Sequence, residues 1–229
     1  MDTALERQTQ AAEAKWREMW RQGPQRLRWD HIPLQYGDAV PDLELRSTSG
    51  DPVRLSETWA HGPALLLFWR HFGCRCGMAR GRALVAEYGS YVEAGATVLV
   101  IGQGEPERAA AYASKFKLPC PMLSDPARAA YAAFGLVEGT PSQILFDAPD
   151  AFLRCDYDAG VGLQEARRAL GDPMVDSPWQ LPGEFVVDGH GIVRLAFRYQ
   201  HCEDYPNPHV LVAAIREAAG DGWQPGREG

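Results

Sequence analysis

The chain has 229 residues, of which 45% are hydrophobic and 23% are charged, and its formal net charge is −7. This length is enough for one sizeable core, and the composition is that of an ordinary globular protein. The negative charge argues against a nucleic-acid-binding protein, which needs a basic surface.

The sequence also lacks the marks of a membrane or secreted protein. No stretch approaches the roughly 18 consecutive apolar residues of a transmembrane helix. The N-terminal stretch MDTALERQTQAAEAKWREMW is charged and lacks the apolar core of a signal peptide. We therefore expect a cytoplasmic protein. Five cysteines are an odd number, unlike a secreted disulfide framework, so a close pair points to redox chemistry or metal binding.

Residues 3–22 are predicted to form a helix that ends at Gly23 and Pro24. Its apolar residues lie loosely on one face: Leu5, Ala12, Trp16, Met19 and Trp20. We expect this helix to pack on the body of the protein or on a second subunit, with a solvated arm as the alternative.

Residues 36–57 indicate a loop and two short strands joined by a turn at 49–51. Residues 64–69 are continuously apolar, which is typical of a central strand buried on both faces. Helical spacing begins after Gly77 and ends at Gly95. Further elements follow: a strand at 96–102, a helix at 105–116, a short strand at 118–125 and a helix at 126–136.

The last third of the chain combines an irregular segment with a clear hairpin. Residues 137–181 contain weak helical signals at 151–157 and 163–170 and too few apolar residues for a core, so we interpret them as an insertion. A hairpin of strands at 185–187 and 192–197 is predicted next, followed by an amphipathic helix at 207–219. We expect an N-terminal helical extension at 1–30 and one domain at 31–229.

This order of elements predicts an α/β fold with a central mixed sheet flanked by helices. Cys74 and Cys76 fall between the buried strand at 64–69 and the following helix. Functional sites commonly form in such loops, at the carboxyl ends of strands.

Several segments in order carry a family likeness: GDAVPDLEL, GPALLLFWRHFGCRC, GATVLVIGQG, LPCPMLSDPARAAYAAFGL and LPGEFVVDGHGIV. The chain resembles the alkyl hydroperoxide reductase/thiol-specific antioxidant (AhpC/TSA) superfamily, and more narrowly its peroxiredoxin-like branch with an Arg-His-Phe-Gly-Cys motif. The likeness runs from Tyr36 to the C-terminal helix, without the insertion. It implies a thioredoxin-like fold.

The resemblance also assigns residues. Cys74 matches the first, reactive cysteine of the family and Cys76 the second. Pro182 matches the position of the cis-proline that faces the active cysteine in thioredoxins. The sequence departs from the family in three ways: the two cysteines are separated by one residue, His71 replaces the threonine of true peroxiredoxins, and an insertion is present.

The chemistry of the pair depends on the thiolate, which a helix N-terminus and nearby positive charge favour. Cys74 has both in prospect, because Arg70, His71, Arg75 and Arg80 are near it in sequence. We therefore expect a lowered pKa. Cys76 lies closer to the first turn of the helix and would have similar help, so the assignment of Cys74 as the nucleophile rests mostly on the resemblance. A turn can bring residues i and i+2 within the Cα separation of about 4.4–6.8 Å that a disulfide requires, so a labile bridge is possible.

Two alternatives stay open for the pair. Both cysteines could be buried structural thiols. They could also bind Zn²⁺ or Cu⁺ together with His71, or with His201 and Cys202, although the basic surroundings oppose a cation. Cys202 is a possible third thiol whose acidic neighbours make it a poor nucleophile. Cys120 and Cys155 are interpreted as structural, as are Trp59 and Trp69 in the core and Gln103 in a tight turn.

The resemblance implies a thiol oxidoreductase that reduces peroxides without a cofactor. A cellular dithiol or low-molecular-weight thiol would regenerate it, and a homodimer is possible. Disulfide exchange by the same pair, or a non-catalytic module that binds a metal or partner, are the alternative functions. The insertion is a candidate wall of the substrate site.

Overall fold

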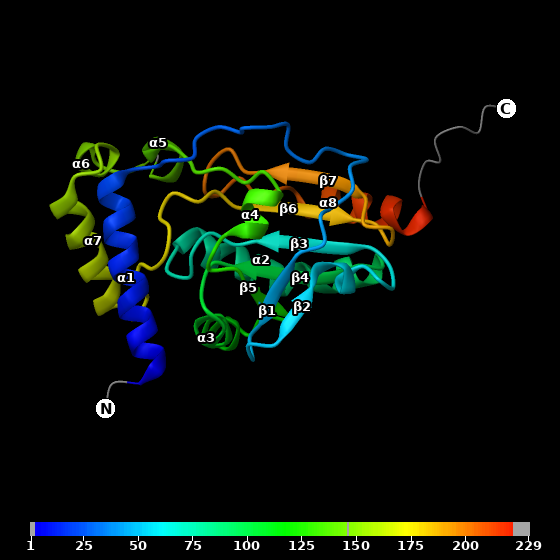
Figure 1. Cartoon of the computed structure of the whole chain (residues 1–229), viewed down its shortest axis with the longest axis horizontal. Coiled ribbons are helices and arrows are strands. Elements are labelled where there is room, and N and C mark those ends of the chain that lie inside the picture. The colour runs from blue at the N-terminus through cyan, green and yellow to red at the C-terminus, as the bar shows by residue number, and fades with distance from the viewer. Residues whose placement is uncertain (1–2, 146, 222–229) are drawn as a thin grey trace.

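The computed structural model describes residues 3–145 and 147–221. A seven-stranded sheet lies at its centre, in the order β2-β1-β5-β4-β3-β6-β7 (Figure 1). The neighbours of β4 are parallel to it, and the remaining pairs are antiparallel. The strands are β1 (Glu44–Ser47), β2 (Pro52–Arg54), β3 (Ala64–Phe68), β4 (Thr97–Gly102), β5 (Met122–Ser124), β6 (Gly183–Val187) and β7 (Val193–Arg198). The predicted α/β fold with a mixed sheet is confirmed.

The helices cover both faces and one end of this sheet. They are α1 (Ala4–Gln22), α2 (Arg75–Glu93), α3 (Pro106–Phe116), α4 (Ala129–Ala133), α5 (Pro141–Ile144), α6 (Asp150–Leu153), α7 (Tyr157–Ala169) and α8 (Pro208–Arg216). A 3₁₀ turn occupies Leu55–Thr58 and a π-helical turn Glu217–Asp221. No helix within 3–145 and 147–221 is long and apolar enough to cross a membrane.

Strand β3 shows why an uninterrupted apolar run forms the centre of the sheet. All five of its residues are buried, because side chains alternate between two covered faces. Leu65 and Leu67 pack in one cluster with residues of α2, α3 and α8. Leu66 and Phe68 pack in a second cluster with α4 and with the segment around Leu55.

A third apolar cluster lies at the end of the sheet toward which β3 points, beside α1 and α7 (Figure 1). Trp16 and Trp20 of α1 are fully buried there, and Trp20 stacks on Trp179 with ring centroids 5.1 Å apart. The expectation that the N-terminal helix packs on the body is therefore confirmed, and the solvated arm is wrong. Of the predicted apolar face, Leu5 is exposed and Met19 is half-buried.

Some predicted boundaries are wrong. The helix placed after Gly77 begins at Arg75, because apolar periodicity does not register a first turn that contains Arg75 and Gly77. In the insertion, the helical signal at 151–157 is interrupted after Leu153, and α7 starts earlier than 163 because the Asp156 carboxylate accepts the N–H of Ala159 at 2.9 Å. The division into 1–30 and 31–229 stays a prediction.

Candidate active site

The site is built where β3 passes into α2. Cys74 is the N-cap residue of α2, and Cys76 lies in the first turn of this helix. A disulfide joins the two sulfur atoms across a Cα–Cα distance of 5.4 Å. Each cysteine is only 6% exposed. A helix N-terminus carries unpaired N–H groups and a partial positive charge, which favour a thiolate at Cys74 over a thiol.

Arg70 places its guanidinium against both sulfur atoms. Its Nη1 lies 2.9 Å from Cys74 Sγ and 3.5 Å from Cys76 Sγ. The side chain is buried, and no carboxylate in the described ranges pairs with it. Burial lowers the pKa of Arg70 to about 10, so the group keeps its charge at neutral pH. A buried cation without a carboxylate partner is a strong reason for the adjacent sulfur to ionise.

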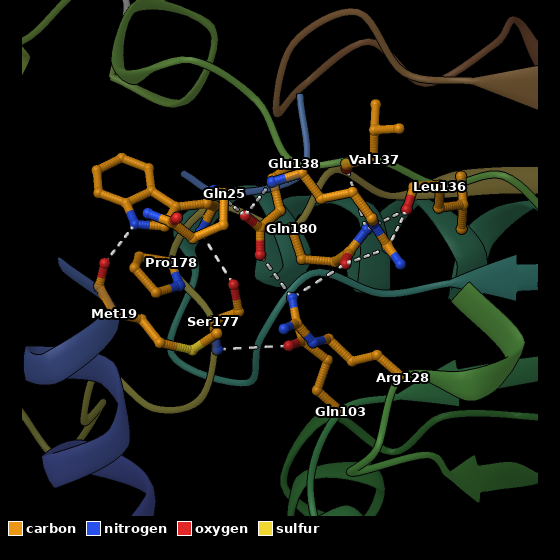
Figure 2. Close-up of polar contacts among 12 residues, drawn as sticks. Met19, Gln25, Gln103, Arg128, Leu136, Val137, Glu138, Ser177, Pro178 and Gln180 are labelled. Carbon is orange, nitrogen blue, oxygen red and sulfur yellow. Dashed lines mark hydrogen bonds and ion pairs between the residues drawn. The ribbon is translucent and has the colours of Figure 1, made fainter. Parts of the chain in front are cut away.

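The rest of the Arg70 guanidinium is held by the backbone of the insertion. Its Nε donates to Gln180 O at 3.2 Å, and its Nη2 donates to Pro178 O. Figure 2 shows what fixes this backbone: the Gln180 amide donates to the carbonyls of Leu136 and Val137, each at 3.1 Å. Arg70 is thus clamped in one orientation toward the sulfur atoms.

Two further bonds anchor the 177–180 segment from other parts of the chain (Figure 2). Ser177 N donates to Gln103 Oε1 at 3.4 Å, while Gln103 Nε2 donates to Arg70 O. Trp179 Nε1 donates to Met19 O at 2.7 Å, which ties the segment to α1. Gln103 lies in the bend after β4, as predicted, and its amide also bridges the arginine loop and the insertion.

His71 is buried beside this arginine. Its Nδ1 atom has no hydrogen-bond partner in the described structure. Burial, followed by the positive charges of Arg70, Arg167 and Arg108, holds the pKa of His71 well below its usual value. The imidazole is neutral at physiological pH.

A cavity of about 570 Å³ opens over the cysteines. This volume is typical of small-molecule sites. Trp16 and Trp20 of α1 form part of its wall together with Phe152 and Met174 of the insertion. The charged and reactive groups that line it are Arg70, His71, Cys74, Arg75, Cys76, Asp147, Arg167, Cys202 and Glu203. The insertion therefore forms a wall of this cavity, and α1 contributes to it as well.

The other predicted arginines have different surroundings. Arg75 is exposed at the cavity, and its side chain forms no ion pair or hydrogen bond with other described residues. Arg80 is buried, but Glu184 and Glu87 pair with it at 2.7 and 2.8 Å. The expectation that Arg80 assists Cys74 is wrong, because two carboxylates already neutralise this guanidinium.

The expected cis-proline is also wrong. The peptide bond before Pro182 is trans, since the described chain contains no cis bond. Leu181 N donates to Val137 O and Pro182 O accepts from Tyr199 N, so the chain enters β6 already extended. Pro182 still lines a small pocket that Arg70 and Cys76 also line.

Cys202 lies in the same apolar cluster as the pair. Its Sγ donates to Ile144 O at 3.4 Å, and burial raises the pKa of its thiol. Cys120 belongs to the core beneath α3, where burial raises its pKa to about 12. Cys155 is half-buried at the edge of the cluster. The expectation of structural roles for Cys120 and Cys155 fits these positions.

The alternative metal site is not assembled. In the part of the chain that the structure describes, no three His, Cys, Asp or Glu side chains are grouped so that they can hold a metal ion. The positive charges of Arg70 and Arg167 near the sulfur atoms also oppose a cation.

Sequence reasoning missed several residues of the site. Arg167 Nη2 donates to Gly73 O at 3.2 Å, although the two residues are 94 positions apart. Nothing in the local pattern of the insertion marks Arg167, Pro178 or Gln180. The tryptophans of α1 were predictable as part of an apolar face, but the surface against which they pack is formed by the insertion.

Solved structures of peroxiredoxins have the same fold. A peroxidoxin BcpB from Mycobacterium tuberculosis aligns with a TM-score of 0.58 at 21% identity, over 80% of this chain and 97% of that one. Peroxiredoxin Q of Xanthomonas campestris aligns with a TM-score of 0.55 at 17% identity, over 81% and 97%. A thiol peroxidase from Chromobacterium violaceum aligns with a TM-score of 0.55 at 16% identity, over 83% and 90%. These alignments confirm the predicted thioredoxin-like fold.

Sequence comparison supplies the family. A thioredoxin-like protein AAED1 of Arabidopsis thaliana, described as chloroplastic, is 29% identical over 102 residues. The match spans 44% of this chain and 40% of that protein's length. The model of the AhpC/TSA family matches residues 36–196, which include the motif and both cysteines. The chain therefore belongs to the AhpC/TSA family.

Proposed function

We propose that the protein reduces peroxides, with Cys74 as the nucleophile and Cys76 as the resolving partner. The observation that carries this proposal is the buried Arg70 guanidinium, which lies 2.9 Å from Cys74 Sγ at the N-terminus of α2 and has no carboxylate partner among the described residues. Arginine and helix terminus together favour the thiolate, which is the reactive form.

The reaction runs in three steps. The Cys74 thiolate attacks the terminal oxygen of a hydroperoxide, the O–O bond breaks, and the alkoxide leaves and takes a proton from water. Cys74 is then a sulfenic acid. The Cys76 thiol attacks its sulfur, water leaves, and the disulfide forms. Two electrons from a thiol reductant of a reducing compartment, such as the predicted cytoplasm, restore the pair.

Arg70 and His71 would have separate parts in the first step. The Arg70 guanidinium stabilises negative charge on sulfur and on the departing oxygen. His71 is neutral and has an unpaired Nδ1, so it is suited to hydrogen-bond a peroxide oxygen. His71 would thereby act in place of the threonine of true peroxiredoxins. Homodimer formation stays a prediction that this mechanism does not require.

Mutation of each cysteine tests the proposal. Wild-type protein should consume an organic hydroperoxide in the presence of dithiothreitol, and Cys74→Ser should be inactive. In the absence of a reductant, Cys76→Ser should react once and stop as a sulfenic acid, whereas Cys120→Ser, changed away from the site, should retain full turnover with dithiothreitol. Peptide mapping by mass spectrometry after one equivalent of peroxide should find Cys74 bridged to Cys76 and Cys202 unmodified. Undiminished turnover by Cys74→Ser would contradict the assignment.

Disulfide exchange is the second candidate, because His71 stands where peroxiredoxins have a threonine and the two cysteines are already bridged. Reduction of a model disulfide without any consumption of peroxide would favour it over peroxide reduction.

A further inference from the structure

Side chains of α1 and of the insertion form a cover over the disulfide, and this cover limits which reductants can reach the sulfur atoms. Cys74 and Cys76 are each 6% exposed beneath the tryptophans of α1 and the side chains of the insertion. A protein reductant presents its sulfur on its own surface and must lay that surface against the disulfide. Here its sulfur would have to enter a cavity of about 570 Å³, which accommodates a small molecule.

The cover is also firmly attached. Trp20 Nε1 donates to Asp156 O at 2.9 Å, and Arg168 of α7 forms ion pairs with Glu6 and Glu13 of α1. Stacking of Trp20 between Trp16 and Trp179 adds apolar contact, with centroids 5.0 and 5.1 Å apart. Opening the cavity enough for a protein would break all of these contacts.

The inner wall of the cavity favours a ligand with acceptor oxygens. Trp16 Nε1 and Arg167 Nε are buried N–H groups without a hydrogen-bond partner, and both side chains line the cavity. An unpaired buried donor costs about 1–3 kcal/mol. A carboxylate in the cavity would be attracted by the guanidinium charge of Arg167. It would reach the two buried N–H groups only after the side chains that carry them shift.

The mouth of the cavity carries charges of both signs. Arg75 is exposed and unpaired in the described structure, while Asp147 and Glu203 are the exposed carboxylates of the lining. With Arg70 and Arg167 inside, the lining carries three guanidinium groups against two carboxylates. The charged side chains of the inner lining are Arg70 and Arg167, and Asp172, outside the lining, pairs with Arg167 at 3.5 Å.

We propose that the cavity is a binding site for a small anionic thiol, one that carries a carboxylate, and that this thiol rather than a protein dithiol reduces the Cys74–Cys76 disulfide. The inference rests on the proposed function and names its reductant. The thiol's carboxylate binds at Arg167 and Arg75, and its sulfur reaches the disulfide.

The exchange is balanced with two thiols. A thiolate of the first attacks Cys76 Sγ, the disulfide breaks, and Cys74 leaves as a thiolate held by Arg70, whose Nη1 is closer to Cys74 than to Cys76. A second thiolate attacks the sulfur of the bound thiol in the mixed disulfide, and Cys76 leaves. The small thiol is oxidised to its disulfide, and the protein pair gains two electrons.

The test starts from oxidised protein and contains no peroxide, so its failure is separate from failure of the proposed function. Reduction is followed by tryptophan fluorescence with 3-mercaptopropionate, 2-mercaptoethanol, cysteamine or a thioredoxin. Rates are expressed per thiolate and divided by those on a small model disulfide. We expect the anionic thiol to exceed the cationic one about 10-fold, as electrostatic steering allows, and to exceed thioredoxin.

A matched pair of variants locates the effect. Arg75→Gln should lower the anionic preference at least about threefold, and added salt should reduce it in the wild type. Arg82→Gln makes the same charge change on an exposed residue of α2 that does not line the cavity, so the preference should be unchanged. Equal rates for the three small thiols would overturn the proposal, as would reduction by thioredoxin faster than by the anionic thiol.

Discussion

At the scale of the residue, each of the three guanidinium nitrogens of Arg70 has its own contact. Its Nε and Nη2 are occupied by the carbonyls of Gln180 and Pro178, and only Nη1 faces the two sulfur atoms. A lysine has the same charge but a single nitrogen on a flexible stem, so it cannot make these contacts at once. The position therefore requires both the charge and the planar fork.

Substitution of Arg70 separates these requirements. Arg70→Gln should slow oxidation of Cys74 by peroxide roughly 10- to 100-fold, because a charge-assisted hydrogen bond is worth about 1.5–3 kcal/mol. The oxidation rate of Arg70→Lys should lie between the rates of Arg70→Gln and the wild type. Stopped-flow fluorescence measures the rate, and Arg82→Gln is the control. A rate for Arg70→Gln equal to that of the wild type would show that the arginine does not act on the thiolate.

At the scale of the element, the wall of the cavity depends on close contact between α1 and α7. A Cβ atom built on Gly160 of α7 would lie 2.3 Å from Nε1 of Trp20, so only glycine fits beneath this ring. Gly162, two residues further along the same helix, has no neighbouring atom within 4 Å of such a Cβ. A side chain at position 160 would therefore collide with Trp20, whereas a side chain at position 162 would have room.

These two glycines give a matched experiment. Gly160→Ala should lower the free energy of unfolding by about 1–3 kcal/mol, because Trp20 must move. Gly162→Ala should raise it by about 0.5–1 kcal/mol, because alanine is the better helix former. Urea denaturation measures both. If Gly160→Ala proved as stable as Gly162→Ala, α1 would not be seated on α7 through this contact.

The same elements show what sequence reasoning can and cannot find. Strand β3 and the hairpin of β6 and β7 were predictable, because burial on one or both faces leaves an apolar pattern in consecutive residues. The place of Cys74 between a strand and a helix was predictable for the same local reason, whereas its role came from the family resemblance. Arg167 and Gln180 were not, since they act through partners far away in the chain, and no periodicity records a tertiary contact.

At the scale of the whole molecule, the site forms only where separate parts of the chain meet. Helix α1, the β3–α2 turn, the Gln103 loop and the insertion all contribute, and Figure 2 shows several of them converging on residues 177–180. Since His71 lies buried among these parts with three arginines acting on it, its protonation is coupled to the integrity of the assembly.

Stability should therefore fall on the acid side of neutrality. The pKa of folded His71 is well below 6.5, because burial and then Arg70, Arg167 and Arg108 disfavour the cation. Below pH 6.5 the unfolded chain takes up a proton that the folded chain does not. The free energy of unfolding therefore falls by at most about 1.4 kcal/mol for each pH unit of acidification. Between pH 6.5 and 5.0, His71 should thus lower the free energy of unfolding by no more than about 2 kcal/mol.

Urea denaturation of oxidised protein across this pH range measures the slope of the free energy of unfolding against pH. The difference in slope between variants separates the contribution of His71 from that of the carboxylates. His71→Gln should remove up to about 1.4 kcal/mol per pH unit from the slope, whatever its absolute stability. His190→Gln should leave it unchanged, because this exposed side chain of the hairpin turn stays in water in both states. An unaltered slope in His71→Gln would mean that the imidazole is protonated in the folded protein, which would remove it as a neutral partner for a peroxide oxygen.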